Sequence, residues 1–269
     1  MNSSKENIAA KEFARLIEII RVLRSPNGCE WDKEQTSQSL LPYMLEECYE
    51  VIEAVDNEDK ELLKEELGDL LLHVVFQAEI AFDDKSFHIS ESIKGVCDKL
   101  INRHPHIFNN DGQKKRKNDF AKGSWERTKQ IEKNRKSILD GIPKALPSLA
   151  RASRLQEKAA GVGFDWKDRG PVFDKVFEEF DELREAIDSG KDIDIESELG
   201  DLFFSMVNLS RHLGFNPEDV LRKSSSKFYR RFSMLESHLV DKEKSIEDLS
   251  LDELDEVWDI VKSKEKRKG

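Results

Sequence analysis

The chain has 269 residues, of which 37% are charged and 38% hydrophobic, and it contains only 13 glycines and 7 prolines. This composition is typical of long helices with polar outer faces and few turns. The formal net charge of −11 disfavours non-specific binding to nucleic acid or to an anionic membrane surface.

Apolar residues recur every three or four positions along most of the chain, which predicts helices. The first expected helix ends before Pro26. Further helices are expected at about 44–55, 62–82, 89–103, 120–137 and 252–264. Apolar and polar residues do not alternate for long enough anywhere to predict a strand. The prediction is an all-α fold of tandem four-helix-bundle-like repeats.

The sequence offers no export or membrane signal. The polar stretch 1–12 contains no apolar segment of signal-peptide length, and no run approaches the roughly 20 apolar residues of a membrane span. Cys29, Cys48 and Cys97 are widely spaced and form no C-x-x-C pair. Reduced thiols and a cytoplasmic location are therefore expected.

An internal repeat organises the chain. The stretch 46–50 (EECYE) is followed sixteen residues later by 66–69 (ELGD), and the pattern returns at a constant offset of 132 residues as 178–182 (EEFDE) and 198–201 (ELGD). Flanking segments recur as well. The stretch 28–32 resembles 163–166, and Lys99 and Arg103 recur as Lys227 and Arg231. Further along, Trp125, Lys129 and Glu132 recur as Trp258, Lys262 and Glu265. Helix-breaking residues then predict a linker at 137–146 between an N-terminal repeat, 1–136, and a C-terminal repeat, 147–269.

The repeated acidic residues are expected to converge. Positions i, i+3 and i+4 share a helix face, so Glu46 and Glu50 lie together with Glu47 at the edge, and Glu66 and Asp69 share a face of the next helix. Carboxylates that meet between antiparallel helices repel one another unless they are protonated or neutralised. Oxygen ligands select a hard cation, so the pattern predicts Mg²⁺ or Mn²⁺.

Two other interpretations compete with a magnesium site. A glutamate-rich helix face is commonly just solvated, but here the carboxylates lead into stretches that are apolar on nearly every side, 67–76 and 199–207, and these are expected to be buried. Gly68 and Gly200 cost about 1 kcal/mol relative to alanine in a helix, so a close approach is expected there.

A di-iron bundle is the second competing interpretation, and it requires Glu-x-x-His. The matching positions hold Asp69 and Asp201, which disfavours iron. His73 lies one turn beyond Asp69, but its counterpart is Ser205, so we interpret it as a satisfied, partly buried histidine and not as a ligand.

A bound triphosphate would need further cations. Lys227 and Arg231 are four residues apart and project together, and Lys175 precedes Glu179 by four residues, which places an ammonium beside the carboxylates. Each of these could instead be an ordinary surface residue. Trp166 and Trp258 could stack on a base or lie in the core.

Together, the E-E-x-x-E and E-L-G-D motifs and their tandem copy resemble the MazG family of nucleoside triphosphate pyrophosphohydrolases. The stretches 28–36, 103–106 and 163–166 resemble its two-domain bacterial form. The resemblance implies an all-α, homodimeric, Mg²⁺-dependent enzyme, with Mn²⁺ as a substitute. Such an enzyme hydrolyses a broad range of nucleoside triphosphates between the α and β phosphates, giving the monophosphate and pyrophosphate.

The resemblance also implies roles for individual residues. The implied metal ligands are Glu179, Glu182, Glu198 and Asp201, with Glu47, Glu50, Glu66 and Asp69 as further candidates in the N-terminal repeat. The implied nucleotide contacts are Lys175, Lys227, Arg231 and Trp258. The implied catalytic residues are Glu178, Glu179 and Glu182, with Glu178 orienting or deprotonating the attacking water.

The C-terminal repeat is expected to carry the main activity, because Tyr43 stands in the first repeat where the second has Lys175. Asp194 occupies a position where a basic residue is expected in relatives, so nucleotide affinity or selectivity is expected to differ. The alternative function is a nucleotide-sensing or protein-binding regulator with weak turnover, which would suit the first repeat.

Overall fold

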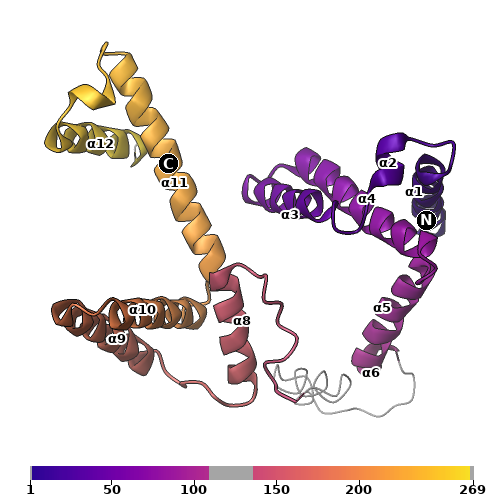
Figure 1. The fold of residues 1–269 in the computed structure, drawn as a ribbon, viewed down its shortest axis with the longest axis horizontal. Coiled ribbons are helices and arrows are strands. Elements are labelled where there is room, and N and C mark those ends of the chain that lie inside the picture. Colours follow the sequence, from indigo (N-terminus) through magenta and orange to yellow (C-terminus); the bar gives the residue numbers. More distant parts are fainter. Residues whose placement is uncertain (1, 109–135, 267–269) are drawn as a thin grey trace. The chain divides into compact units, whose positions relative to one another are not determined.

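The computed structural model describes residues 2–108 and 136–266, and all regular secondary structure in these ranges is helical (Figure 1). The chain divides into two compact units, Met1–Lys115 and Arg116–Gly269. Over the described ranges, no helix combines the length and the apolar character needed to cross a membrane. The prediction of an all-α fold with a repeated helical unit is confirmed.

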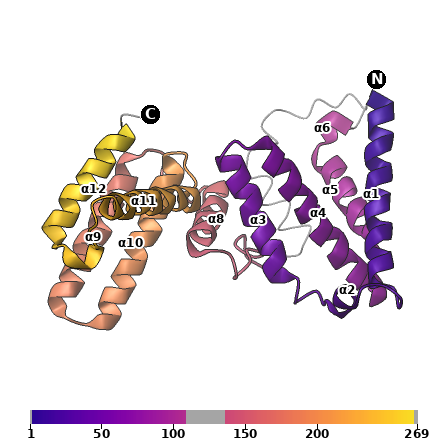
Figure 2. The ribbon, with the colours of Figure 1, turned by 90° about the horizontal axis from the view of Figure 1, so that it is seen from above.

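The first unit is built around an antiparallel helix pair. Its elements are α1 (Asn2–Arg24), α2 (Glu30–Glu34), α3 (Leu41–Asp56), α4 (Lys60–Asp83), α5 (Ile89–Arg103) and α6 (Pro105–Phe108). Helices α3 and α4 lie side by side, and α1 and α5 lie beyond α4 (Figure 2). The four long helices match the predicted ones, whereas the short helices α2 and α6 were not predicted.

Local sequence signals fix the ends of these helices. Asp59 begins α4 because its side chain accepts hydrogen bonds from the backbone N–H groups of Glu61 and Leu62, both at 3.0 Å. The turn after α1 requires Gly28, because a Cβ atom there would lie 2.0 Å from the carbonyl oxygen of Leu23. The core of the unit then forms where α1, α4 and the start of α5 meet, around Ile20, Val75, Phe76 and Ile89.

The second unit repeats the antiparallel pair. Its elements are α8 (Ser148–Gly161), α9 (Gly170–Ser189), α10 (Asp192–His212), α11 (Pro217–Val240), the short 3₁₀ helix η2 (Ile246–Asp248) and α12 (Leu251–Lys266). Gly190 ends α9 in a left-handed conformation, with φ at 71°. Helix α8 packs on α10, and α12 folds back on the C-terminal half of α11 around Leu235, Leu239 and Val261.

Helix α12 confirms the helix predicted at 252–264. The corresponding helix predicted at 120–137, with Trp125, Lys129 and Glu132, lies almost wholly outside the described residues. The stretch 137–147 contains no helix, as its prolines and glycine indicated. The predicted domain limits themselves stay a prediction.

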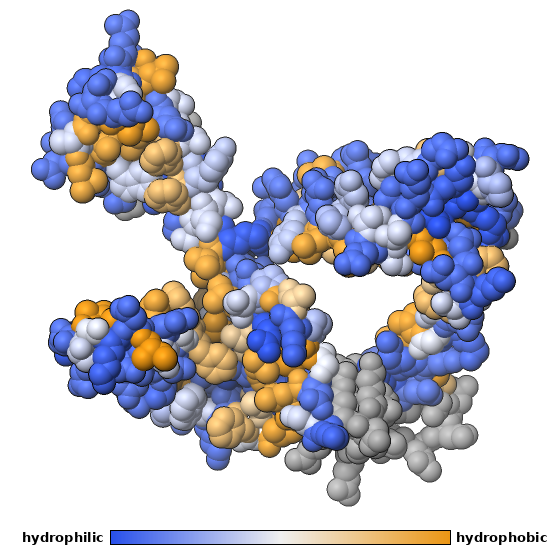
Figure 3. Space-filling model, viewed as in Figure 1, coloured by the Kyte–Doolittle hydropathy of each residue, from blue (hydrophilic) through white to orange (hydrophobic). Residues whose placement is uncertain are grey.

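The expectation that α4 and α10 are buried on every side is wrong for the described residues. One side of each helix faces solvent, and its apolar residues are 39–58% exposed: Leu67, Leu71 and Val74 in α4, and Leu199, Phe203 and Met206 in α10. The close approach expected at Gly68 and Gly200 is likewise not seen, because a Cβ atom added at either position meets no described atom within 4 Å. Neighbouring helices cover the other sides of α4 and α10, and the apolar side chains on the uncovered side reach the surface (Figure 3).

Of the two ion pairs that join α1 to α4 in the described first unit, Arg21–Glu79 and Arg24–Asp83, the first involves a buried carboxylate. Glu79 is 1% exposed, and Arg21 donates from Nε and Nη2 to its two oxygens at 3.1 and 3.2 Å. Replacing Arg21 with alanine would leave this buried carboxylate without its donor. Because the arginine side chain is 43% exposed, the full cost of breaking a buried pair is reduced by solvent screening.

We therefore expect Arg21→Ala to lower the free energy of unfolding of the first unit by about 2 kcal/mol, measured by urea denaturation with circular dichroism. The matched control is Arg15→Ala, which breaks the fully solvated pair with Glu12 and should cost less than about 0.5 kcal/mol. Equal losses in the two variants would contradict the structural role of the Arg21–Glu79 pair.

Candidate metal and nucleotide site

In the second unit, three carboxylates from α9 and α10 converge. Glu179, Glu198 and Asp201 each place one carboxylate oxygen within 4.8 Å of the others. Glu179 is only 6% exposed because it stands on the inner face of α9, at seven-residue spacing between Val172 and Ala186, which are both buried. Apolar packing on either side therefore holds this carboxylate against α10.

Lys175 lies beside this group, as its spacing predicted. Its Nζ is 2.8 Å from Glu178 Oε1 and 2.8 Å from Glu179 Oε1, and the hydrogen bond to Glu178, followed by that to Glu179, raises the pKa of Lys175. One ammonium thus compensates part of the negative charge. Glu178 itself is exposed to solvent.

Glu182 lies one turn further along α9 and is exposed. Desolvation, followed by the charge of Glu179, raises its pKa, and Glu198 adds to the effect. Glu182 therefore feels the field of the carboxylate group, although it is not among the three residues whose oxygens lie within 4.8 Å of one another.

The three nucleotide contacts implied further along the chain lie on the α11–α12 pair. Lys227 is exposed, Arg231 donates from Nε to Glu265 Oε2 at 2.7 Å, and Trp258 packs on Phe228 with ring centroids 5.4 Å apart. In the part of the chain that the structure describes, no ion pair joins Lys227 or Arg231 to the carboxylates of α9 and α10. Trp258 contributes to the α11–α12 core, and its contact with a nucleotide stays a prediction.

The first unit contains the same carboxylate arrangement. Glu47 from α3 and Glu66 and Asp69 from α4 each offer an oxygen within 4.8 Å of the others, and Glu66 is buried. Burial, the charges of Glu50 and Asp69 and a hydrogen bond with Glu50 together raise the pKa of Glu47 to about 7. Burial and the charge of Glu50 also raise the pKa of Glu66. All four candidate ligands of this repeat thus interact.

The first unit has an aromatic pair where the second has an ammonium. Tyr43 stacks on His73, with ring centroids 6.5 Å apart and planes 6° from parallel, and His73 Nε2 lies 3.7 Å from Glu47 Oε1. Burial lowers the pKa of His73, so this imidazole is neutral at pH 7 and leaves the carboxylates uncompensated.

The prediction that His73 is at least partly buried is correct. Its Nδ1, however, has no hydrogen-bond partner among the described residues. The prediction that all of its hydrogen-bonding groups are satisfied is therefore wrong.

Comparison with known proteins identifies the class of protein that carries these paired sites. The chain matches the MazG nucleotide pyrophosphohydrolase domain over residues 35–108 and again over residues 172–234, once in each unit. The first match includes α3 and α4, and the second includes α10 and all of α9 except its first two residues. Both carboxylate groups therefore lie within the matched segments.

Two relatives align over nearly their whole length. The nucleoside triphosphate pyrophosphohydrolase/pyrophosphatase MazG of Thermotoga maritima is 46% identical over 253 residues, which cover 93% of this chain and 95% of that protein. The nucleoside triphosphate pyrophosphohydrolase of Escherichia coli K12 is 44% identical over 263 residues, which cover 94% and 98%. The chain belongs to the MazG family, and the predictions that it is an enzyme and a hydrolase are confirmed.

The raised pKa of Glu47 makes a prediction about stability. The folded first unit binds a proton more tightly than the unfolded chain, whose glutamate titrates near 4.5. Stability therefore falls as the pH rises from about 4.5 to 7, and the penalty is complete above pH 7. Without metal, Glu47→Gln should be roughly 1 to 3 kcal/mol more stable than the unaltered chain at pH 8 and equal to it at pH 4.

Chemical denaturation in a chelating buffer at the two pH values tests this expectation. Glu46→Gln is the matched control, because Glu46 is the neighbouring exposed glutamate outside the carboxylate group, and it should change neither value. Added Mg²⁺ should stabilise the unaltered chain at pH 8 more than it stabilises Glu47→Gln. A pH-independent difference between the two proteins would contradict the coupling.

Proposed function

We propose that the second unit hydrolyses nucleoside triphosphates to the monophosphate and pyrophosphate, in a Mg²⁺-dependent reaction of broad base specificity. The observation that carries the proposal is the convergence of Glu179, Glu198 and Asp201 beside Lys175. The names of the two aligned relatives support the same reaction.

The residues of the site fit a magnesium ion. All donors are carboxylate oxygens, which a hard cation prefers, and three carboxylates leave coordination positions for water and phosphate oxygens. Three negative charges against one ammonium leave a net charge that a divalent cation would neutralise. Mn²⁺ accepts the same ligands and is the expected substitute. A bound Mg²⁺ supplies positive charge that neutralises the phosphates and acidifies water.

The side chains of the chain then have separate roles. Glu179, Glu198 and Asp201 hold the metal, with Glu182 as the further ligand on α9. Glu178 accepts a hydrogen bond from Lys175 and faces solvent, so it is placed to orient the attacking water and to take its proton. Lys175 fixes both Glu178 and Glu179, and Lys227 and Arg231 are the proposed contacts of the departing pyrophosphate.

The first unit favours a second candidate function. Its carboxylates lack a neighbouring ammonium, because Tyr43 and a neutral His73 occupy that place. A cation beside the metal ligands helps to orient a triphosphate, so this unit suits a metal-dependent nucleotide sensor with weak turnover. The same chain would then contain a catalytic unit and a regulatory one.

The proposed reaction is tested by removing ligands in the second unit. Glu179→Gln and Asp201→Asn should each reduce pyrophosphate release from ATP by about 10- to 100-fold or more, since even groups that only support a metal ligand cost this much. Glu185→Gln is the matched control, because Glu185 is an exposed glutamate on the same helix outside the carboxylate group.

The corresponding changes Glu47→Gln and Asp69→Asn in the first unit should retain most of the activity. Chromatography of the products separates the two candidate functions. Monophosphate and pyrophosphate indicate the enzyme, whereas bound but unaltered ATP indicates a sensor. Near-full activity in both Glu179→Gln and Asp201→Asn would exclude the second unit as the main catalytic site.

We also propose that the chain forms a homodimer. Four apolar residues follow one another along the outer face of α9 and are 41–65% exposed, namely Phe173, Phe177, Phe180 and Ile187. Helix α10 exposes Phe203 and Met206 in the same way. An apolar stripe of this kind normally faces another layer of protein, and a second copy is the occupant that the family resemblance implies.

Light scattering after gel filtration tests the dimer. The unaltered chain should have twice the 31.1 kDa mass of one chain, and Phe177→Glu/Phe180→Glu should shift the population towards the monomer, because charge on a buried apolar face is costly. Val240→Glu is the control, since Val240 is a 73% exposed residue at the end of α11. A monomeric unaltered chain, or a double variant with unchanged mass, would contradict the proposed interface.

A further inference from the structure

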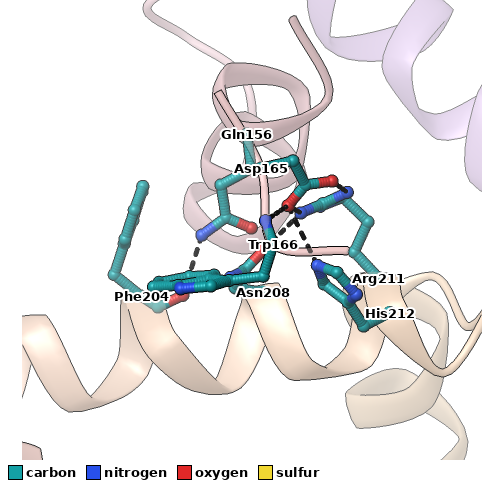
Figure 4. Close-up of polar contacts among 7 residues, drawn as sticks. All are labelled: Gln156, Asp165, Trp166, Phe204, Asn208, Arg211 and His212. Atoms are coloured by element: carbon teal, nitrogen blue, oxygen red, sulfur yellow. Dashed lines mark hydrogen bonds and ion pairs between the residues drawn. The ribbon is translucent and has the colours of Figure 1, made fainter. Parts of the chain in front are cut away.

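Asp165 fastens the loop between α8 and α9 to the end of α10. Arg211 donates from Nη1 to Oδ2 at 2.8 Å and from Nη2 to Oδ1 at 2.6 Å, and His212 Nε2 lies 2.9 Å from the same Oδ1 (Figure 4). The backbone N–H of Trp166 adds a fourth contact at 3.0 Å. The hydrogen bonds from Arg211 lower the pKa of Asp165 to about 2, so this loop anchor stays ionised at any physiological pH.

A second contact fixes the helix from which the loop departs. Gln156 of α8 is buried and donates from Nε2 to the backbone carbonyl oxygen of Phe204 in α10 at 2.9 Å. Helix α8 is therefore held to α10 by Gln156 at Phe204, and the loop that follows is held two turns further along α10 by Asp165 at Arg211 and His212. These two attachments restrict the movement of the chain from Gln156 to Asp165, and therefore of the neighbouring Trp166.

The attached loop holds apolar side chains at the surface. Phe164 is 83% exposed and Trp166 is 43% exposed. Figure 4 shows the indole of Trp166 lying along α10, in the stretch between Phe204 and Asn208. Burial would stabilise an apolar side chain of this size, yet the Trp166 indole remains partly exposed. Closing the loop alone does not explain this exposure.

The indole lies beside the helix that carries two of the three carboxylates. On α10, Asp201 shares a face with Ser205, Asn208 and His212, which follow it at intervals of three and four residues. Ser205 lies about 6 Å along the helix axis from Asp201, at the rise of about 1.5 Å per residue. Figure 4 shows the Trp166 indole along α10 between Phe204 and Asn208, and Asp201 precedes Phe204 by three residues on the same helix, a rise of about 4.5 Å along the axis.

The first unit reaches a similar arrangement with different bonds. Trp31, in the corresponding motif, is 53% exposed, and Arg24 of α1 fixes its segment by donating from Nη1 to the carbonyl oxygens of Asp32 at 2.7 Å and Gln35 at 3.3 Å. Trp31 contacts Tyr43 edge to face, with ring centroids 6.4 Å apart, and Tyr43 stacks on the His73 ring beside Glu47. In both units an arginine thus fixes the segment of an exposed tryptophan beside a helix that carries carboxylates of the group.

We propose that Trp166 stacks on the base of the bound nucleotide and that Asp165 is the positioning residue that holds the indole there through Arg211 and His212. This inference rests on the proposed nucleotide site of the second unit. Only the sugar separates a base from its α-phosphate, so a base over α10 is compatible with phosphates at the carboxylates. Stacking on an indole accepts every base, which agrees with broad specificity.

Comparing the affinities for a ligand with a base and a ligand without one separates base contacts from phosphate contacts. The probes are α,β-methylene-ATP, which has a base, and inorganic tripolyphosphate, which has none, each with Mg²⁺ and measured by calorimetry. All proteins carry Asp69→Asn, to remove the contribution of the first unit. Trp166→Ala should weaken binding of the nucleotide about tenfold and leave tripolyphosphate within about twofold, as expected for one lost stacking contact.

One conservative variant and one control variant sharpen this comparison. Trp166→Phe keeps an aromatic ring and should recover most of the lost affinity. Phe164→Ala is the matched control in the same loop and should change neither affinity. Equal losses for both ligands in Trp166→Ala, no loss at all, or the same loss in Phe164→Ala would overturn the proposed base contact.

Asp165→Asn tests the positioning role. It should weaken nucleotide binding in the same base-dependent way, and the double variant with Trp166→Ala should bind no more weakly than Trp166→Ala alone, because the two residues act through one contact. Additive losses would overturn the role of Asp165. Arg211→Lys, which retains the charge but loses the two-pronged contact, gives the same comparison if Asp165→Asn does not fold.

Turnover of ATP by the unaltered chain, measured in parallel, separates this inference from the proposed function. Formation of monophosphate together with unchanged binding by Trp166→Ala would overturn the base contact alone. Base-dependent binding that requires Trp166 without any product would overturn the hydrolytic function and support the base contact.

Discussion

The repulsion between carboxylates that meet across an antiparallel helix pair governs this structure. Glu66 in α4 and Glu179 in α9 are buried among acidic neighbours, although an unpaired carboxylate in such a place is costly. Apolar packing holds the helices together despite this repulsion, as Val172 and Ala186 do on either side of Glu179. The same unfavourable contact is maintained in two units, and a divalent cation is the partner that we propose to relieve it.

The two units relieve the repulsion to different extents. In the second unit Lys175 contacts Glu179 directly and places one positive charge beside the carboxylates. In the first unit a neutral histidine and a tyrosine take that place, and the pKa of Glu47 rises to about 7 instead. The first site therefore contains a glutamate that titrates near neutral pH, whereas the second contains an ammonium beside its carboxylates.

Sequence periodicity and spacing predicted the long helices and the convergence of the carboxylates, because both depend on contacts between residues three or four apart and on one short connection. The same reasoning placed Lys175 beside Glu179. It failed where distant segments meet: no local pattern pairs Asp165 with Arg211, 46 residues away. It also misjudged the apolar stretches 67–76 and 199–207, because periodicity identifies an apolar face but not the protein that covers it.

Those uncovered faces have a consequence for the site. Helix α10 carries Glu198 and Asp201 towards α9 and exposes Phe203 and Met206 on other sides. Helices α9 and α8 already pack on α10, and a second copy on the exposed side would add a further contact, which would help the ligands on this helix to keep their geometry. Burial of these side chains would contribute roughly 25 cal/mol for each Å² of apolar surface. The proposed assembly and the proposed metal binding would therefore act on the same helix, and the free energy of assembly would offset part of the carboxylate repulsion that the metal neutralises.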